Sequence, residues 1–193
     1  MTAQWRMDVP AGWAVWEPGS PDVRALCAAA TASRRAELTL ARRIRVVEKE
    51  VTALPGNVRQ VGVRVTAPRT GAVSGSMSLT QWARPTTDGG KRLNARLHLD
   101  ALAAHDPEPT RAYRHREATV EKVPAGQLVL RNEVWRPRRR AGWVTELEAT
   151  IFPRGSEDMF ELAVRSRHAD LQPTLMAELS LMAHSFRLDD APA

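Results

Sequence analysis

The sequence predicts one α+β domain, in which an antiparallel sheet of about seven strands packs against N-terminal and C-terminal helices. Apolar residues recur with helical spacing near both ends of the chain, whereas they alternate with polar residues along the region between. Short polar turns connect the alternating segments, and they favour antiparallel neighbours because parallel strands need long crossovers. We expect the single domain to span residues 1–188 and residues 189–193 to form a frayed tail.

The chain begins with a predicted strand and a turn that is rich in tryptophan and proline. Residues 4–9 alternate in polarity, and Trp13 begins a second short strand. Ser20 and Pro21 have the residue types of a helix N-cap and a first helical position, so we expect a helix from about that point. Trp13 is expected as a core side chain under the helices, whereas Trp16, closer to the polar turn, is the candidate for an exposed contact.

A long helical region follows, without glycine or proline from Asp22 to Leu54. Ser33 is a candidate cap that divides it into a short and a long helix. The apolar stripe of the long helix faces a core, and it consists of Leu40, Ile44, Val47, Val51 and Leu54. A final helix shows the same pattern in Leu171, Leu175, Leu179, Met182 and Phe186.

Seven segments between these helices are predicted as strands, because they alternate in polarity and have turn residues on both sides. They are residues 60–66, 76–80, 92–99, 116–123, 126–135, 142–152 and 159–167. Residues 104–114 are expected as a loop. A sheet with one polar and one apolar face buries the apolar face against helices, which gives a two-layer domain.

Composition excludes several classes of protein. The chain is 43% hydrophobic and 26% charged, which is typical of a globular domain and not of a disordered or fibrous one. Neither an apolar leader nor a run long enough to span a bilayer is present, and the single Cys27 cannot form an intrachain disulfide. We therefore expect a cytoplasmic protein without membrane insertion. Its net charge of +6 favours attraction to acidic partners.

No motif of a known catalytic or metal site is present. The histidines never occur as HExxH or HxH, and GxSxG and GxxxxGK[ST] are absent. Glu146 and Glu148 lie on one face of a strand, about 7 Å apart, and such a pair can act as acid and base on a glycoside. The alternation instead places both on the polar face beside arginines. We expect no enzymatic activity, no metal and no cofactor.

Charged residues of several predicted strands share the polar phase. We expect them to form a mixed ladder, with a basic patch as the alternative. The basic members are Arg64, Arg92, Arg96, Arg131 and Arg165, and the acidic members are Glu133, Glu146, Glu148 and Glu161.

The stretch "WRPRRRAGW", residues 135–143, is the candidate interaction site. Its arginines could contact an acidic protein or phosphates, and its tryptophans could stack on them, although a solvated hairpin tip is the alternative interpretation. Nucleic-acid binding through residues 136–140 is a less favoured hypothesis, because backbone binding needs a distributed basic stripe. The candidate partner-binding residues are Trp16, Trp135, Arg136, Arg138, Arg139, Arg140 and Trp143.

The element order, with "VPAGW" at residues 9–13 and "ELAVRSRHADLQPTLMAELSLMAHSFRL" at residues 161–188, resembles the PsbP-like and DcrB-like superfamily, in its actinobacterial members. The resemblance implies an antiparallel sheet packed on helices and a non-enzymatic role as a subunit, assembly factor or chaperone. Our leading hypothesis is accordingly a cytoplasmic accessory domain that binds another protein. The order also resembles the helix-grip fold of START-like proteins, which implies a small-molecule pocket of about 300–1,000 Å³ between the final helix and the sheet.

Overall fold

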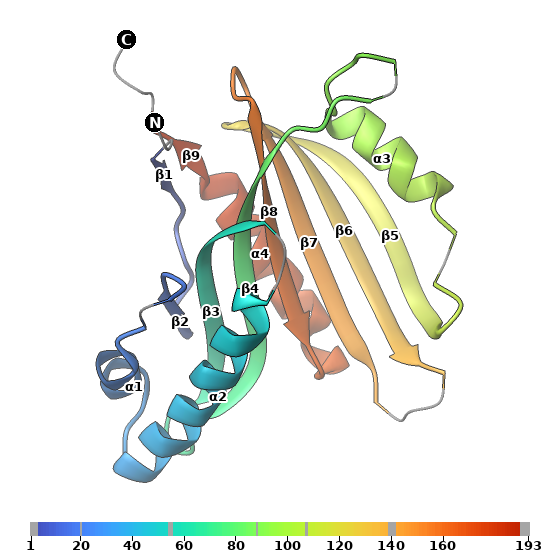
Figure 1. Cartoon of the computed structure of the whole chain (residues 1–193). Helices are drawn as coiled ribbons and strands as arrows, with labels where there is room; N and C mark the ends of the chain where they lie inside the picture. The colour runs from blue at the N-terminus through green and yellow to red at the C-terminus, as the bar shows by residue number, and fades with distance from the viewer. Residues whose placement is uncertain are drawn as a thin grey trace.

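The computed structural model describes residues 4–19, 21–53, 56–87, 89–106, 108–138 and 142–189. A seven-stranded sheet in the order β2-β3-β4-β8-β7-β6-β5 forms its centre, and each neighbouring pair is antiparallel (Figure 1). This confirms the predicted α+β class. The strands are β2 (Trp13–Trp16), β3 (Asn57–Ala67), β4 (Ala72–Ala83), β5 (Arg111–Val123), β6 (Gly126–Pro137), β7 (Val144–Pro153) and β8 (Asp158–Ser166).

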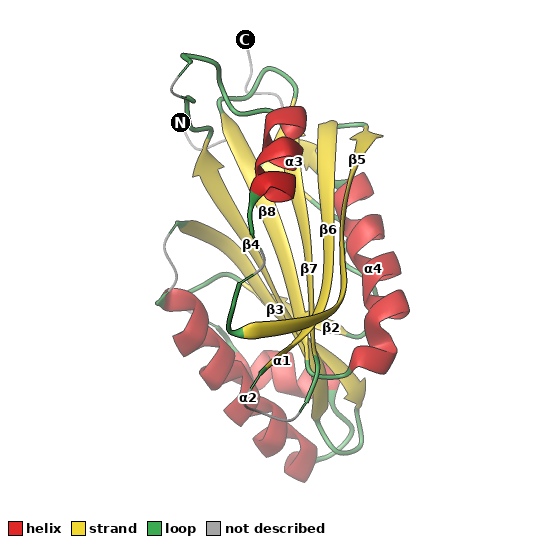
Figure 2. Ribbon diagram, turned by 90° about the vertical axis from the view of Figure 1, so that its right-hand side faces the viewer, coloured by secondary structure: helices red, strands yellow, loops and turns green. Residues whose placement is uncertain are grey.

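Helices cover both faces of this sheet. Helix α4 (Gln172–Ser185), which follows the short 3-10 helix η1 (Ala169–Leu171), packs on one face, here named the α4 face. Helix α2 (Arg34–Thr52) and helix α3 (Ala95–Ala104) pack on the other, the α2–α3 face (Figure 2). Helix α1 (Val23–Ala30) adjoins α2 and β2.

The two ends of the chain meet in a separate ribbon of β1 (Trp5–Arg6) and β9 (Arg187–Leu188). The Arg6 guanidinium pairs with the Asp189 carboxylate at 2.6 Å, and the Asp189 N–H donates to the Gln4 carbonyl. The predicted tail therefore has its first residue paired with β1, and residues 190–193 lie outside the described ranges.

The α4 face carries the larger core. Leu175, Leu179, Met182 and Ala183 of α4, together with Phe186, are fully buried against strands β4 to β8, because these strands present their alternate apolar residues to the helix, whereas Leu181 of α4 is exposed. The cluster includes Met77, Leu128, Leu147, Phe160, Leu162, Leu175, Leu179, Met182 and Phe186. Trp13 belongs to it as predicted, and its Nε1–H donates to the Glu178 carboxylate at 2.9 Å.

This packing bears on the small-molecule pocket that the START-like resemblance implies between the final helix and the sheet. The described side chains between α4 and the sheet form a solid contact cluster where that fold would enclose an apolar pocket. Helix α3 also interrupts the run of strands, so the predicted order of elements is wrong at this point. The apolar pocket expected beneath the middle of α4 is therefore replaced by packed side chains, and the pocket described below lies at the first turn of α4 and has a mostly polar lining.

Helix α2 forms the second core against β2 and β3. Its predicted stripe is buried from Leu40 to Val51, and Leu54 lies outside the described residues. The Ser33 hydroxyl accepts the Ala36 N–H at 3.3 Å, which confirms the predicted cap. The first helix begins at Val23, two residues after the predicted start at about Pro21, and Asp22 is its cap in place of Ser20; Ser20 itself lies outside the described residues.

The segment predicted as a strand over 92–99 is largely the helix α3. The Asn94 side chain caps it by accepting the Leu97 N–H at 3.0 Å. Ala95, Leu99 and Leu102 recur at helical spacing and pack on Val129 and Phe152. The alternation of polarity extends over only eight residues, and the segment forms a helix because a helix buries these apolar side chains against the sheet. The predicted loop 104–114 is also shorter than expected, because β5 begins at Arg111.

Candidate binding cleft

A cleft of about 950 Å³ opens on the α2–α3 face, where the sheet is left uncovered between the two helices (Figure 1). Its floor is formed by β4, β8, β7 and β6, and one wall by α2. Along β4 the lining runs from Ser74 to Trp82, which corresponds to about 27 Å at the rise of a β-strand. The cleft therefore has the length of an extended peptide of about eight residues.

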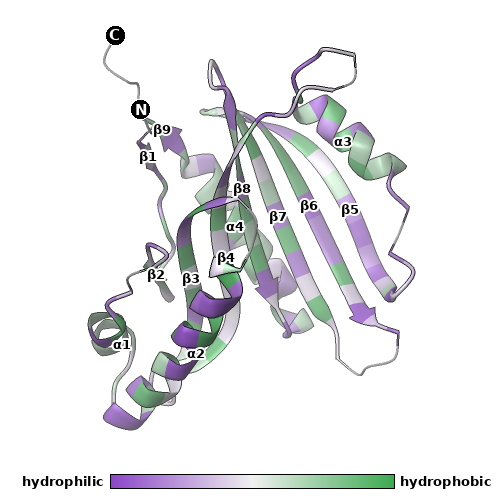
Figure 3. Ribbon diagram, viewed as in Figure 1, coloured by the Kyte–Doolittle hydropathy of each residue, from purple (hydrophilic) through white to green (hydrophobic). Residues whose placement is uncertain are grey.

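Strand register arranges the floor in cross-strand rows, and the alternation of polar and apolar residues is visible along these strands in Figure 3. The first row is Ser76, Arg165, Glu146 and Glu133. The second is Ser78, Ala163, Glu148 and Arg131, and the third is Thr80, Glu161, Thr150 and Val129. Opposite charges are neighbours at Arg165 and Glu146 and at Glu148 and Arg131, whereas Glu146 and Glu133 are like charges on neighbouring strands, so these rows form a mixed ladder.

Three of the arginines predicted for this ladder lie elsewhere. Arg64 lies on the α4 face, where its guanidinium pairs with Glu178 at 2.8 Å. Arg96 lies on α3 and pairs with Asp100, and Arg92 precedes that helix and pairs with Glu157.

Arg131 is the centre of an ion network on the floor. Its guanidinium binds the carboxylate of Glu148 and lies 3.9 Å from that of Glu133, which Arg116 also binds at 3.2 Å. Burial disfavours the charged guanidinium of Arg131, but the carboxylates of Glu148, Glu133 and Glu146 more than offset this, so its pKa is raised. The Glu133 side chain is almost completely buried, and the guanidinium groups of Arg116 and Arg131 are the partners that a buried carboxyl group requires.

Glu161 is the carboxyl group of the cleft whose pKa is shifted most. Burial and the nearby Glu148 carboxylate, opposed by Arg131, together raise its pKa to about 7. Beside it, the Thr150 hydroxyl donates to Glu148 at 3.2 Å and lies 3.4 Å from Nε2 of His98. Burial lowers the pKa of His98, Arg131 lowers it as well, and Glu148 acts in the opposite direction. The net pKa is lowered, so the imidazole is neutral at neutral pH. The floor thus carries, in Glu161, a carboxyl group that gains a proton near neutrality.

Glu161→Gln is expected to make the domain more stable above neutral pH. Because the folded protein raises the pKa of Glu161 from 4.5 to about 7, it binds a proton more tightly than the unfolded chain does, and stability falls as pH rises between these values. Urea unfolding at several pH values measures this. The free energy of unfolding should change less with pH in Glu161→Gln than in the wild type, and the urea midpoint of the variant should be higher at about pH 8. The exposed Glu17→Gln is the control; equal slopes for wild type and Glu161→Gln would contradict this account.

Basic side chains gather at the end of the cleft where β8 ends. Arg43 of α2, Arg165 of β8 and the adjoining Arg167 all line it and are exposed. Within the described ranges, none of these three guanidinium groups forms an ion pair with a carboxylate. The end of β6 and the start of β7 lie at this same end of the sheet, beside the end of β8 (Figure 1).

The structure places the residues of the candidate interaction site, residues 135–143, in different surroundings. The Trp135 ring is buried beneath the Arg111 guanidinium, 4.0 Å from its centre, and its Nε1–H donates to Glu146 at 2.8 Å. The exposed Arg136 guanidinium lies 5.2 Å from the ring centre of the half-buried Trp143. Arg138 is exposed, and its backbone N–H donates to the Thr110 carbonyl. Arg139 and Arg140 lie outside the described residues.

Trp16 does not have the exposure that we expected. Only 7% of it is accessible, because it packs in the core beneath α2. Its Nε1–H donates to the Glu48 carboxylate at 2.6 Å, and the same carboxylate accepts the Gly19 N–H. Burial of the ring and pairing of its only polar atom correct the expectation of an exposed contact.

Two further properties bear on function. Among the described residues, no group of three or more His, Cys, Asp or Glu side chains could hold a metal ion. Every helix within the described ranges is too short or too polar to cross a membrane.

Comparisons with known proteins show the fold alone. No protein-family model matches the sequence, and no curated sequence matches it significantly. The structure is similar to the crystal structure of LpqN, a protein involved in cell envelope biogenesis of Mycobacterium tuberculosis, with a TM-score of 0.51 and 11% sequence identity. The similarity covers 98% of this chain and 85% of the LpqN chain.

Proposed function

We propose that this protein is a non-catalytic accessory domain whose cleft on the α2–α3 face binds an extended acidic segment of a partner protein. The observation that carries the proposal is the set of exposed guanidinium groups without a carboxylate partner, Arg43, Arg165 and Arg167, at one end of the cleft. Arginine side chains bind carboxylates with charge-assisted hydrogen bonds, which are stronger than neutral ones.

The rest of the cleft suits such a segment. The carboxylates of Glu146 and Glu148 are already engaged by Arg111 and Arg131, so they leave little unpaired negative charge on the floor. Glu161, whose pKa is raised to about 7 by burial and by Glu148, is partly protonated at neutral pH. Ser76 and Ser78 offer hydroxyl groups to a backbone lying along β4.

Positive charge outside the cleft adds to the long-range attraction. Arg136, near the end of β6, and Arg138, which follows that strand, are exposed, and the net charge of +6 attracts an acidic partner at long range. LpqN, which has a similar fold, is involved in cell envelope biogenesis, and an accessory role for this chain agrees with the PsbP-like resemblance. We propose that the partner is a protein of the same cellular compartment.

Selection from a random peptide library displayed on phage tests this function. The protein is expected to enrich peptides with several Asp or Glu residues, and their affinity should fall at least about tenfold in the double variant Arg165→Glu with Arg167→Glu. Arg24→Glu with Arg35→Glu is the matched control, because it changes two exposed arginines away from the cleft by the same charge. Fluorescence anisotropy measures both affinities.

Three results would contradict the proposal. The first is selection of peptides without acidic residues, and the second is a loss of affinity in the control variant as large as that in the cleft variant. The third is preferential binding of a single-stranded oligonucleotide with a steep salt dependence, which would favour the nucleic-acid hypothesis for residues 136–140.

A further inference from the structure

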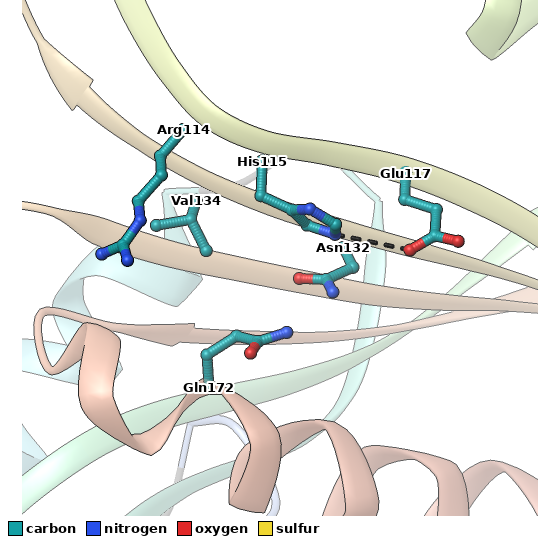
Figure 4. Close-up of a pocket in the computed structure, with 6 residues that line it drawn as sticks. All are labelled: Arg114, His115, Glu117, Asn132, Val134 and Gln172. Carbon is teal, nitrogen blue, oxygen red and sulfur yellow. Dashed lines mark ion pairs between the residues drawn. The ribbon is translucent and has the colours of Figure 1, made fainter.

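A second pocket, of about 300 Å³, lies on the α4 face beside the first turn of α4 (Figure 4). It is on the opposite side of the sheet from the cleft, because Asn132 is opposite Leu147 in the register and Leu147 belongs to the core beneath α4. The lining residues are Arg114, His115 and Glu117 of β5, Asn132 and Val134 of β6, and Gln172 of α4.

The pocket contains a polar group without a partner. Asn132 is only 9% exposed, and its Oδ1 makes no hydrogen bond to any described residue. In Figure 4 its amide lies between the His115 ring and the Gln172 amide, directed into the pocket. A buried acceptor left unpaired is unfavourable, and native proteins satisfy such atoms with protein, water or ligand. The Asn132 amide is therefore placed for a molecule that donates a hydrogen bond.

The other lining groups indicate what kind of molecule this is. His115 Nε2 lies 3.4 Å from a Glu117 carboxylate oxygen, so the carboxylate has a partner within the pocket and does not require a cationic ligand. The exposed Arg114 guanidinium adds further donors to the lining, and the acetate titration below tests whether it selects an anion instead. The two amides, Asn132 and Gln172, each offer one acceptor and two donor hydrogens. Hydroxyl groups match this set because each of them both donates and accepts. The volume is at the small end of ligand pockets.

We propose that this pocket binds a small neutral polyhydroxylated molecule of about the size of a monosaccharide. Asn132 accepts a hydrogen bond from one hydroxyl through Oδ1 and donates to another through Nδ2, while Gln172 closes the pocket from α4. Val134 supplies the apolar contact for a C–H surface. The proposal is independent of peptide binding in the cleft, because the two sites lie on opposite faces of the sheet.

Titration of the isotope-labelled protein with glucose, myo-inositol and glycerol, followed by amide NMR shifts, tests the proposal. Glucose or inositol should give saturable shifts at residues 114–117, 132–134 and 172, and glycerol should bind more weakly because it makes fewer contacts. Asn132→Leu should abolish these shifts. It should also raise the thermal midpoint of the ligand-free protein, because it removes the unpaired amide at similar volume.

Two further variants keep the test informative. Gln172→Leu, at the start of α4, should weaken binding at least about threefold without loss of the fold. Thr119→Val is the matched control, since Thr119 is exposed on the same face of β5 outside the pocket, and it should bind as wild type does. Absence of a saturable shift with all three probes, unchanged binding by Asn132→Leu, or saturation by acetate or ethylammonium instead would overturn the proposal.

Discussion

Arg131→Met is expected to lower the free energy of unfolding by about 3–5 kcal/mol near neutral pH. Methionine keeps much of the side-chain volume but removes the positive charge that neutralises Glu148 and lies 3.9 Å from the buried Glu133. Removal of one member of a buried ion network costs far more than removal of an exposed pair, because the remaining charge is left unpaired in the interior. Urea unfolding near neutral pH measures the loss.

The control for this variant is Arg92→Met, which breaks the exposed pair with Glu157 and should cost less than about 1 kcal/mol. The deficit of Arg131→Met should shrink as the pH is lowered, since protonation of the unpaired carboxylates removes the buried charge. Addition of Glu148→Gln should restore part of the stability. A cost for Arg131→Met as small as that for Arg92→Met would show that the network is solvated and does not organise the floor.

Trp16→Ala is expected to cost about 3–5 kcal/mol, as truncation of a buried aromatic side chain does. The ring fills the core beneath α2, and its Nε1–H pairs with Glu48, which also holds the backbone of Gly19. The Glu48 carboxylate therefore links helix α2 both to Trp16 and to the turn at Gly19 that precedes α1. Thermal unfolding of the variant should show a strongly lowered midpoint.

Trp16→Phe keeps one aromatic ring but loses the Nε1–H donor and part of the buried indole volume; it should cost about 1–2 kcal/mol, less than Trp16→Ala. Trp143→Ala serves as a comparison, because this ring is only half-buried and stacks on the exposed Arg136. Wild-type stability of Trp16→Ala combined with weakened peptide binding would return Trp16 to the binding surface and contradict its assignment to the core.

Local patterns were sufficient to predict most of the fold. The α2 stripe with its Ser33 cap, and the alternating residues of β6, β7 and β8, produce the elements that they predict, because burial of one face dictates the period. The exception is α3, where the alternation of residues 92–99 is too short to exclude a helix. Its Asn94 cap and the spacing of Ala95, Leu99 and Leu102 are the signals that were available.

The cleft could be predicted only in part. Polarity alternation placed Arg131, Arg165, Glu146, Glu148 and Glu161 on a common polar phase, and the structure brings all five together. Polarity alternation does not show that these polar positions face a cleft, because that depends on which face of the sheet each helix covers. Arg64 shares the polar phase of its own strand, but pairing register turns that phase toward α4. Arg43 was not a candidate, since nothing in a helix sequence shows that it borders a sheet.

Mapping of the bound acidic peptide on the protein tests the central claim most directly. The account predicts that titration with a selected peptide shifts the amide NMR signals of β4 from Ser74 to Trp82, those of β7, and those of β8 around Arg165. The double variant Arg165→Glu with Arg167→Glu should abolish these shifts. Shifts confined to the α4 face or to the outer edge of β5, with the cleft unchanged, would contradict it.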